Sequence, residues 1–399
     1  MYKLGKIEKK SVTALFSVFP LKKGKYLRVR LITIATFCII SALVGWSIAQ
    51  LSLVEQGIRK AKEILNHLQS EITRSHAKIA LPRQLATFPF AETTGVVTST
   101  KSIAIRSVIA PYNPSLIPAT NGAYTLFFRY NLLHPSYHSC IGTVPLNSEF
   151  TQGEKEFRRL SLHSKYAEDP RACFVDNQLY LFYSTLHPEN SHCRMMCIAN
   201  LDPDTFATNY VTALDLNTQW VERNWCPFEY VGIDDKRELL IEYQLSPRKL
   251  LSLPDPQVND LRSIPLPHNV TYTLLPWASR WGQIRGGTPA QRIGNEYLSF
   301  FHSSFKEEDG TTWYVMGAYT FLTEPPFTIT KMSSYPILFR SIYDTPPMHT
   351  ADTNKRVIFP AGFVIDKDRI HLACGENDCA IKIITFDKQK LLASLAPLH

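Results

Sequence analysis

The chain has 399 residues, of which 45% are hydrophobic, so it can bury a large core. Its net charge of +8 is concentrated in residues 1–30, which hold nine Lys or Arg and one acidic residue, Glu8. Removing this tail from the totals of 43 Lys and Arg and 35 Asp and Glu leaves 34 of each, so we expect no nucleic-acid partner.

Residues 31–54 follow the basic tail and are uncharged throughout. About 20 apolar residues in a helix cross a bilayer, so this segment predicts a transmembrane helix. Because the positive flank comes first, the tail 1–30 should be cytoplasmic and the rest of the chain exported, to a periplasm or to a Golgi or ER lumen. A cleaved signal peptide is the alternative, but the long tail and long apolar run favour a single-pass anchor.

Residues 55–84 have a different pattern, with apolar side chains at helical spacing among Lys, Glu and Gln. They predict a helical stem. A short coiled-coil seam and a helix packed on the following domain are the alternatives.

From residue 85 to 399 the sequence changes to short strands and turns, and five segments resemble one another. Each has a proline near its start, an apolar strand, a polar turn and a second apolar strand. The segments are 113–131, 168–184, 224–247, 286–304 and 359–378. Their spacing leaves room for about four strands per unit, which predicts an all-β fold, a five-bladed β-propeller. A β-sandwich is the alternative.

Polar side chains at the starts of these segments should converge at one end of a central channel. Carboxylates and amides bind sugar hydroxyls in pairs, a Trp face packs on a pyranose, and arginines hold phosphate or orient a carboxylate. The pattern therefore predicts a sugar site. The candidates are Asn113, Glu168, Asp169, Arg171, Glu222, Asn224, Trp225, Arg285, His302 and Asp378. Four of them have a structural alternative: an arginine partner for Glu168, packing between blades for Trp225, a core histidine for His302 and a turn former for Asp378. Glycosidic cleavage or transfer needs a proton donor of raised pKa, and Asp169 is the candidate. We expect neither a metal nor a cofactor, since His192, Cys193 and Cys197 lack a second well-spaced ligand pair.

Five motifs in order resemble the glycoside hydrolase family 130 type of five-bladed propeller. They are EDPR at 168–171, NWCPF at 224–228, GGTPA at 286–290, FPAG at 359–362 and GEND at 375–378. The resemblance spans about residues 110 to 395. That family acts on β-mannosides, chiefly as inverting phosphorylases, and related β-1,2-mannosyltransferases share the fold.

The resemblance implies roles for individual residues. The aspartate of the EDPR-type motif is the family's proton donor, which corresponds to Asp169. By the same matching, Arg129, Arg171, Arg285 and His302 would bind sugar or phosphate, and Asp378 would hold sugar hydroxyls. We therefore expect a membrane-anchored enzyme that transfers or phosphorolyses a β-mannosyl-like unit, with a sugar nucleotide or sugar phosphate as donor and a glycan as acceptor.

Two other functions stay open from the sequence. A glycan-binding propeller without catalysis would use the same pocket. An inverting hydrolase would need a second carboxylate to activate water, and Glu222 or Asp378 is the candidate.

Overall fold

The computed structural model describes residues 80–398, except for 120–121, 133–137, 191, 217–220, 233, 274 and 348–353. The described residues belong to one compact unit, Lys78–His399, and most of its regular structure is β-strand. The helices in this part of the chain are short: α4 (Arg83–Ala86), α5 (His268–Thr271), α6 (Ala278–Trp281) and α7 (Lys388–Ala393). The prediction of an all-β fold is confirmed.

The predicted membrane anchor precedes the part of the chain that the structure describes. No helix within the described residues is long and apolar enough to cross a membrane. The basic tail 1–30, the predicted transmembrane helix 31–54 and residues 55–79 of the predicted stem lie outside those residues. These assignments stay predictions.

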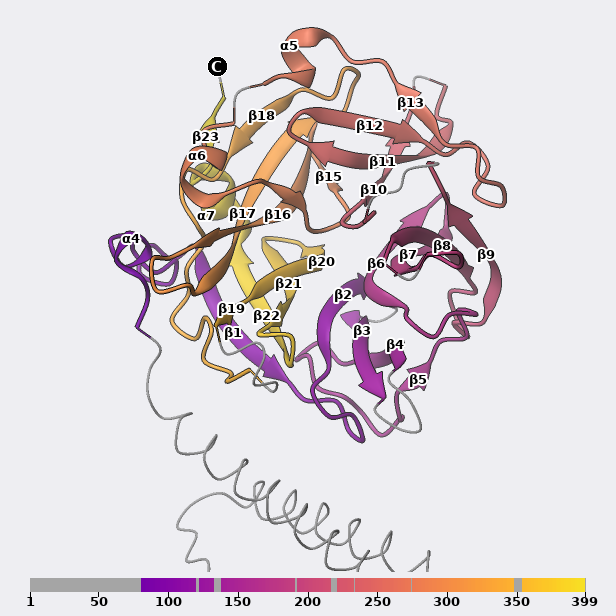
Figure 1. The fold of residues 1–399 in the computed structure, drawn as a ribbon, viewed down its shortest axis with the longest axis horizontal. Coiled ribbons are helices and arrows are strands. Elements are labelled where there is room, and N and C mark those ends of the chain that lie inside the picture. Colours follow the sequence, from indigo (N-terminus) through magenta and orange to yellow (C-terminus); the bar gives the residue numbers. More distant parts are fainter. Residues whose placement is uncertain are drawn as a thin grey trace, which may run out of the picture. The chain divides into compact units, whose positions relative to one another are not determined.

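The strands form five sheets around a common centre, in a propeller-like arrangement (Figure 1). The first sheet holds β2 (Tyr112–Pro118), β3 (Tyr124–Leu132), β4 (His138–Leu146) and β5 (Arg158–Arg159). The second holds β6 (Glu168–Val175), β7 (Gln178–Leu186), β8 (Arg194–Leu201) and β9 (Thr208–Leu214). The third holds β10 (Cys226–Val231), β11 (Arg237–Leu245), β12 (Arg248–Ser252) and β13 (Arg262–Ile264).

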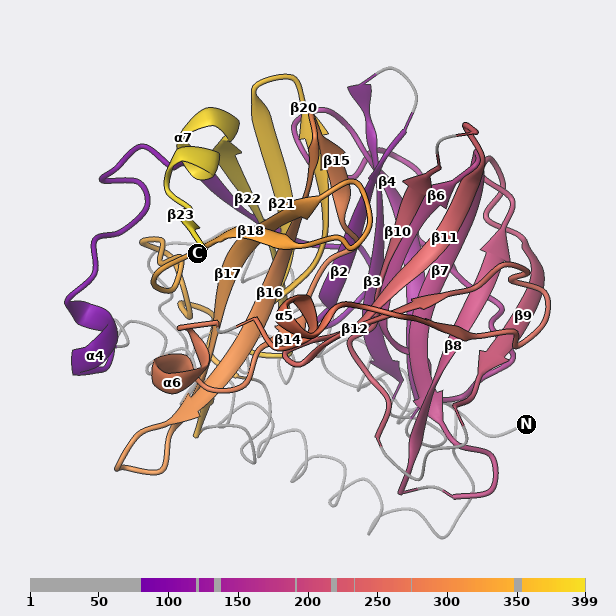
Figure 2. The ribbon, with the colours of Figure 1, turned by 90° about the horizontal axis from the view of Figure 1, so that it is seen from above.

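The fourth sheet departs from the four-stranded pattern, because seven strands belong to it. They are β14 (Arg285–Gly286), β15 (Gln291–Ile293), β16 (Glu296–Lys306), β17 (Thr312–Leu322), β18 (Ile329–Met332), β19 (Lys355–Arg356) and β23 (Ala396–Pro397). The GGTPA motif interrupts its first strand between β14 and β15. Figure 2 shows the sheets from the side, with the long β16–β17 hairpin extending outward.

The fifth sheet, the closing sheet, joins the two ends of the described chain. It contains β20 (Ile358–Asp366), β21 (Arg369–Glu376) and β22 (Ala380–Asp387), and its outer strand is β1 (Val97–Ile103). β1 pairs antiparallel with β22, from Val97 opposite Phe386 to Ile103 opposite Ile381. The repeat pattern gives no indication of this pairing, because β1 precedes the first repeat.

Each of the five repeated segments is an antiparallel hairpin whose first strand lies at the inner edge of its sheet. These inner strands meet at the centre: β2 contacts β6 and β20, and β6 contacts β10. The predicted role of the repeats as inner blade hairpins is confirmed.

Glycines allow this close meeting of inner strands. A Cβ on Gly362 would lie 2.4 Å from Ser115 Oγ, and one on Gly375 would lie 2.7 Å from the Asn113 backbone nitrogen. Real Cβ contacts are longer than this, so these glycines of the FPAG and GEND motifs are required by packing.

Candidate active site

The candidate site lies where neighbouring inner strands begin. Asn113 is the second residue of β2 and Asp169 the second residue of β6, and each precedes a proline. Both have a left-handed backbone, with φ of 45° and 57°, at a register shift in the pairing with the next strand. Such bulges turn a side chain away from its strand, and Asn and Asp tolerate left-handed φ better than most residues. The two bulges thus bring the side chains of Asn113 and Asp169 together.

Asp169 is 7% exposed and its carboxylate has two side-chain donors from the first sheet. Asn113 Nδ2 donates to Asp169 Oδ1 over 2.8 Å, and Arg129 Nη1 donates to the same oxygen over 3.1 Å. No side-chain donor from the described residues reaches Asp169 Oδ2 within hydrogen-bond distance. The site can therefore present one oxygen of Asp169 to a ligand.

The pKa of Asp169 corrects one sequence expectation. Burial raises this pKa, but the Arg129 charge, the hydrogen bond from Asn113 and the charges of Arg171 and Arg223 outweigh burial. The pKa of Asp169 is therefore below its ordinary value, whereas a raised pKa was expected. Asp169 is an ionised carboxylate at neutral pH, held so by the arginines around it.

Glu168 is 2% exposed and serves as the anchor for those arginines. Arg129 Nη2 lies 2.7 Å from Glu168 Oε1, and Arg194 contacts both oxygens at 2.9 and 2.8 Å. Arg223 Nη2 lies 3.9 Å from Oε2. Burial raises the pKa of Glu168, and the three arginines oppose that effect. These contacts agree with the interpretation of Glu168 as an arginine partner.

Arg171 ties three sheets together beneath Asp169. Its guanidinium donates to the Gly287 carbonyl over 2.7 Å, to Asn224 Oδ1 over 3.1 Å and to the Gly286 carbonyl over 3.3 Å. Nη1 also donates to the Asp169 carbonyl over 3.3 Å. The N–H donors of Arg171 are therefore engaged within the protein. Arg171 and Asn224 hold the site together, and the GGTPA motif supplies the carbonyls of Gly286 and Gly287 that accept from Arg171.

His302 lies on β16 opposite Arg285 of β14. The ring is 2% exposed, and burial together with the Arg171 and Arg285 charges lowers its pKa to about 3, so it is neutral. Its Nδ1 has no hydrogen-bond partner among the described residues. Arg285 itself is exposed. His302 lies near Asp169, whose charge acts on the His302 pKa.

Trp225 requires a correction. It is fully buried in the core cluster that the second and third sheets share, so it offers no face to a sugar. Glu222 Oε2 accepts a hydrogen bond from Trp225 Nε1, and Oε1 accepts one from the Tyr243 hydroxyl, both over 3.1 Å. Trp225 therefore packs between blades, as in the alternative interpretation, and Glu222 accepts the hydrogen bond of the buried Trp225 N–H.

Asp378 lies in the turn between β21 and β22, with φ of 51°. Ile358 at the beginning of β20 pairs with Glu376, so this turn lies at the same end of the closing sheet as the beginning of β20. The neighbouring Asn377 is structural: its Oδ1 accepts from the Val357 backbone N–H over 2.7 Å. Within the part of the chain that the structure describes, no hydrogen bond or ion pair joins Asp378 to Asp169.

Arg194 and Arg223 also belong to the site, although neither is among the substrate-binding candidates predicted from the sequence. Arg194 begins β8, the third strand of its sheet, and reaches Glu168 only through the strand register. Arg223 lies between the predicted site residues 222 and 224, so its position in the sequence was the indication that it belongs to the site. Its side chain is 38% exposed, against 12% for Arg129 and 16% for Arg194.

The sequence matches no protein-family model and no curated relative. Among solved structures it is similar to MPT-4, a mannose phosphorylase from Leishmania mexicana in complex with a phosphate ion. That similarity has a TM-score of 0.51 and 14% identity, and covers 77% of this chain and 94% of MPT-4. A hypothetical protein from Leishmania major is similar with a TM-score of 0.50 and 16% identity, over 76% of this chain and 94% of the other. At such identities the likeness concerns the fold: the chain has the propeller fold that its resemblance to glycoside hydrolase family 130 predicts.

Proposed function

We propose that this protein is a carbohydrate-active enzyme that transfers a β-mannosyl-like unit with inversion, with Asp169 as the general base. The observation that carries this proposal is the state of Asp169, a buried carboxylate whose pKa is lowered by its neighbours. Transfer of a sugar to a hydroxyl requires a base that removes the hydroxyl proton, and an ionised carboxylate can do this at neutral pH. The reverse reaction, phosphorolysis, would require Asp169 to be protonated first.

The charge around Asp169 supports an anionic sugar donor. Four guanidiniums, those of Arg129, Arg171, Arg194 and Arg223, accompany the two carboxylates of Glu168 and Asp169, which leaves two positive charges in excess. Arginine forks suit phosphate oxygens. Arg223 is the most exposed of the four, so it is our candidate for the phosphate of a sugar phosphate or sugar nucleotide. The phosphate ion bound by MPT-4 agrees with a donor of this class.

The membrane anchor belongs to the same proposal. The uncharged segment 31–54 would hold the protein in a membrane with the tail 1–30 in the cytoplasm and the propeller exported. A tail, span, stem and catalytic domain is a layout more often met in glycan-building transferases. This supports transfer by analogy only.

The other two functions have weaker support. For hydrolysis, Glu222 is unsuited as the base that activates water, because both of its oxygens accept hydrogen bonds from Trp225 and Tyr243. A glycan-binding propeller without catalysis would use Asp169 only to accept hydrogen bonds from sugar hydroxyls, and an absence of turnover would identify it. The experiment below separates these cases.

The test uses the full-length chain, purified in detergent, with GDP-mannose or mannose 1-phosphate as donor and mannose oligosaccharides as acceptors. We expect glycan elongation with inversion, and an Asp169→Asn variant slower by roughly 10²- to 10⁴-fold, the usual contribution of a general base. Asp176→Asn is the matched control, since Asp176 lies in the turn of the same hairpin with a side chain that is 73% exposed.

Turnover that survives Asp169→Asn would remove Asp169 from the mechanism. Saturable sugar binding without turnover on either donor would identify a glycan-binding protein instead.

A further inference from the structure

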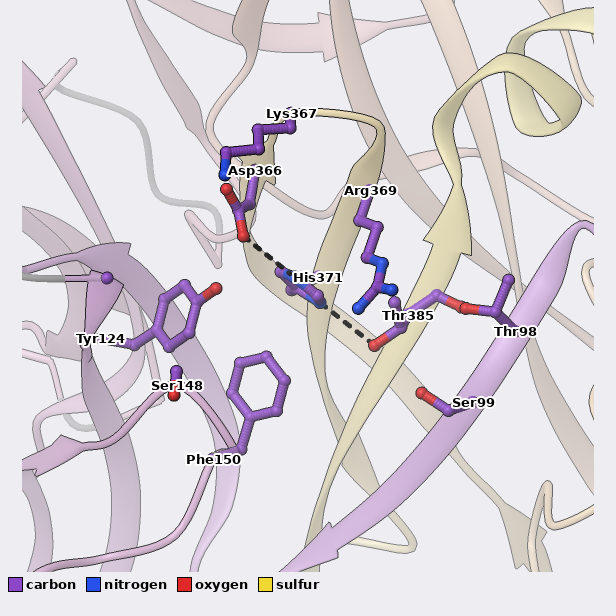
Figure 3. A pocket seen from close by; sticks show the side chains of 11 residues that line it. Thr98, Ser99, Tyr124, Ser148, Phe150, Asp366, Lys367, Arg369, His371 and Thr385 are labelled. Carbon is purple, nitrogen blue, oxygen red and sulfur yellow. Dashed lines mark hydrogen bonds and ion pairs between the residues drawn. The ribbon is translucent and has the colours of Figure 1, made fainter.

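A cavity lies at the opposite end of the propeller from Asp169, between the first sheet and the closing sheet (Figure 3). We call it the far-end cavity. Phe359 of β20 pairs with Gly375, which packs on Asn113 at the Asp169 end. Asp366, which lines the cavity, comes seven residues later in the same strand, or roughly 23 Å at about 3.3 Å per residue. The far-end cavity is therefore a separate place on the molecule.

The floor of the far-end cavity consists of packed rings. Tyr124 and Phe150 stack with centroids 4.8 Å apart, and His371 meets Phe150 edge-on at 4.9 Å. All three are buried, which fixes their positions. Burial lowers the pKa of His371, Asp366 opposes this and Arg369 adds to it, so the ring is neutral at pH 7. The floor is rigid and carries no charge.

The rim of the far-end cavity carries the charges. Lys367 and Arg369 are exposed, and neither side chain has a hydrogen-bond or ion-pair partner among the described residues. The Asp366 carboxylate is half exposed and lies 4.0 Å from His371 Nε2, next to the Tyr124 hydroxyl. Figure 3 shows these side chains around one opening, with the hydroxyls of Ser99 and Ser148 below them. The rim has one positive charge in excess.

Size and charge together indicate the ligand. The volume of the far-end cavity is about 680 Å³, which is within the usual range of 300–1,000 Å³ for small-molecule sites. An inorganic phosphate would leave most of this space empty, and a neutral sugar would leave the one excess positive charge of the rim without a counter-charge. A sugar phosphate satisfies both conditions: Lys367 and Arg369 bind the phosphate, while Asp366 and the serine hydroxyls bind sugar hydroxyls.

We propose that the far-end cavity is a second ligand site, which binds a sugar phosphate without acting on it. This site is independent of the proposed catalytic function, because it shares no residue with the Asp169 site. Its occupation can be measured as binding, whether or not the protein turns over a sugar donor.

The test is calorimetric titration of the full-length chain in detergent with mannose 6-phosphate, mannose and inorganic phosphate. The test variant is Lys367→Gln with Arg369→Gln, which removes both charges but keeps side-chain size. The matched control is Arg292→Gln with Lys306→Gln, two exposed basic residues of the fourth sheet. A third variant, Ser148→Trp, fills the cavity and leaves its charges in place.

We expect wild type and control to bind mannose 6-phosphate at the far-end cavity. The Lys367/Arg369 variant should lack this binding step, or should bind with an affinity lower by about tenfold or more. Ser148→Trp should resemble the Lys367/Arg369 variant, and melting temperatures should stay close to wild type. Identical titrations for all four proteins would overturn the site. Equal affinity for inorganic phosphate or for free mannose would overturn the ligand assignment.

Discussion

Arg129 is the residue on which the charges of the candidate active site depend. One guanidinium group reaches Glu168 over 2.7 Å and Asp169 over 3.1 Å, and its Nε donates to Ser139 Oγ over 2.9 Å. These contacts fix its orientation between the first and second sheets. Arg129 is also the largest influence that keeps the pKa of Asp169 low.

Replacing Arg129 by Met should therefore raise the pKa of Asp169. A general base works in its ionised form, so activity is lost as pH falls through the pKa of the base. We expect the acidic limb of the pH–rate profile to move to higher pH in Arg129→Met. The stability of the wild-type protein also depends on this ionisation. The ionised form of Asp169 stabilises the fold above its unfolded pKa of about 3.9, and this stabilisation is lost as pH falls through its lower folded pKa.

Arg194→Met is the control for that measurement, since Arg194 contacts Glu168 but is not among the main influences on the pKa of Asp169. Its acidic limb should stay near that of wild type. If both variants moved the acidic limb equally, the loss of one positive charge anywhere in the site would explain the shift. The special role of Arg129 would then be refuted.

The sequence reveals some of these residues and conceals others for physical reasons. Asp169 and Asn113 stand at repeat starts, so their meeting could be predicted from the pattern. Arg194 could not, because only the register of three paired strands brings it to Glu168. For Trp225 the sequence left a sugar platform and packing between blades open, because burial between two sheets leaves no local mark in the sequence.

At the scale of elements, the inner strands carry both the packing and the chemistry. The bulges at Asn113 and Asp169 hold non-glycine residues at positive φ, a conformation that costs about 1–3 kcal/mol and is often found at functional sites. The facing strand β21 has Gly375 where β2 approaches, so Asn113 keeps its position. The five hairpins were predictable from their repeated pattern, whereas the interrupted inner strand of the fourth sheet was not.

Gly375→Ala should displace Asn113. The new Cβ would lie 2.2 Å from Asn113 Oδ1 and 2.7 Å from its backbone nitrogen, and the backbone cannot yield easily. We expect a loss of about 1–3 kcal/mol in the free energy of unfolding, as for other overpacked sites, and weaker activity because Asn113 donates to Asp169. Urea denaturation measures the first effect.

Gly153→Ala is the control, because no heavy atom lies within 4 Å of its added Cβ. It should change stability by less than about 0.5 kcal/mol. Equal stability of the two variants would show that the inner strands can separate without cost.

At the scale of the whole molecule, β1 completes the ring of sheets. It adds the outer strand to a sheet whose other strands come from the C-terminal end of the chain. Val97 and Ile103 are 2% and 7% exposed and pack into the core, while the residues between them face outward or are partly covered. Their burial holds the two ends of the propeller together.

Ile103→Asp should therefore destabilise the whole described unit. A buried carboxylate without a partner is among the most costly substitutions, and we expect a loss of about 3 kcal/mol or more, together with a lower thermal midpoint. Ser102→Asp introduces the same charge one residue away on the exposed face and should have little effect. A melting temperature that Ile103→Asp leaves unchanged would contradict the closing role of β1.

The pairing of β1 with β22 also sets the order of events during synthesis. Thr98 and Thr385, joined by a hydrogen bond, are 287 residues apart. The ribosome must release the sequence as far as β22 before β1 meets its partner, so β1 waits until the last sheet of the propeller has emerged. Contacts this distant in sequence slow folding, and the unpaired edges that wait for them are open to association with other chains. We therefore expect folding in the cell to be limited by this final closure, with β1 the segment that most needs protection until then.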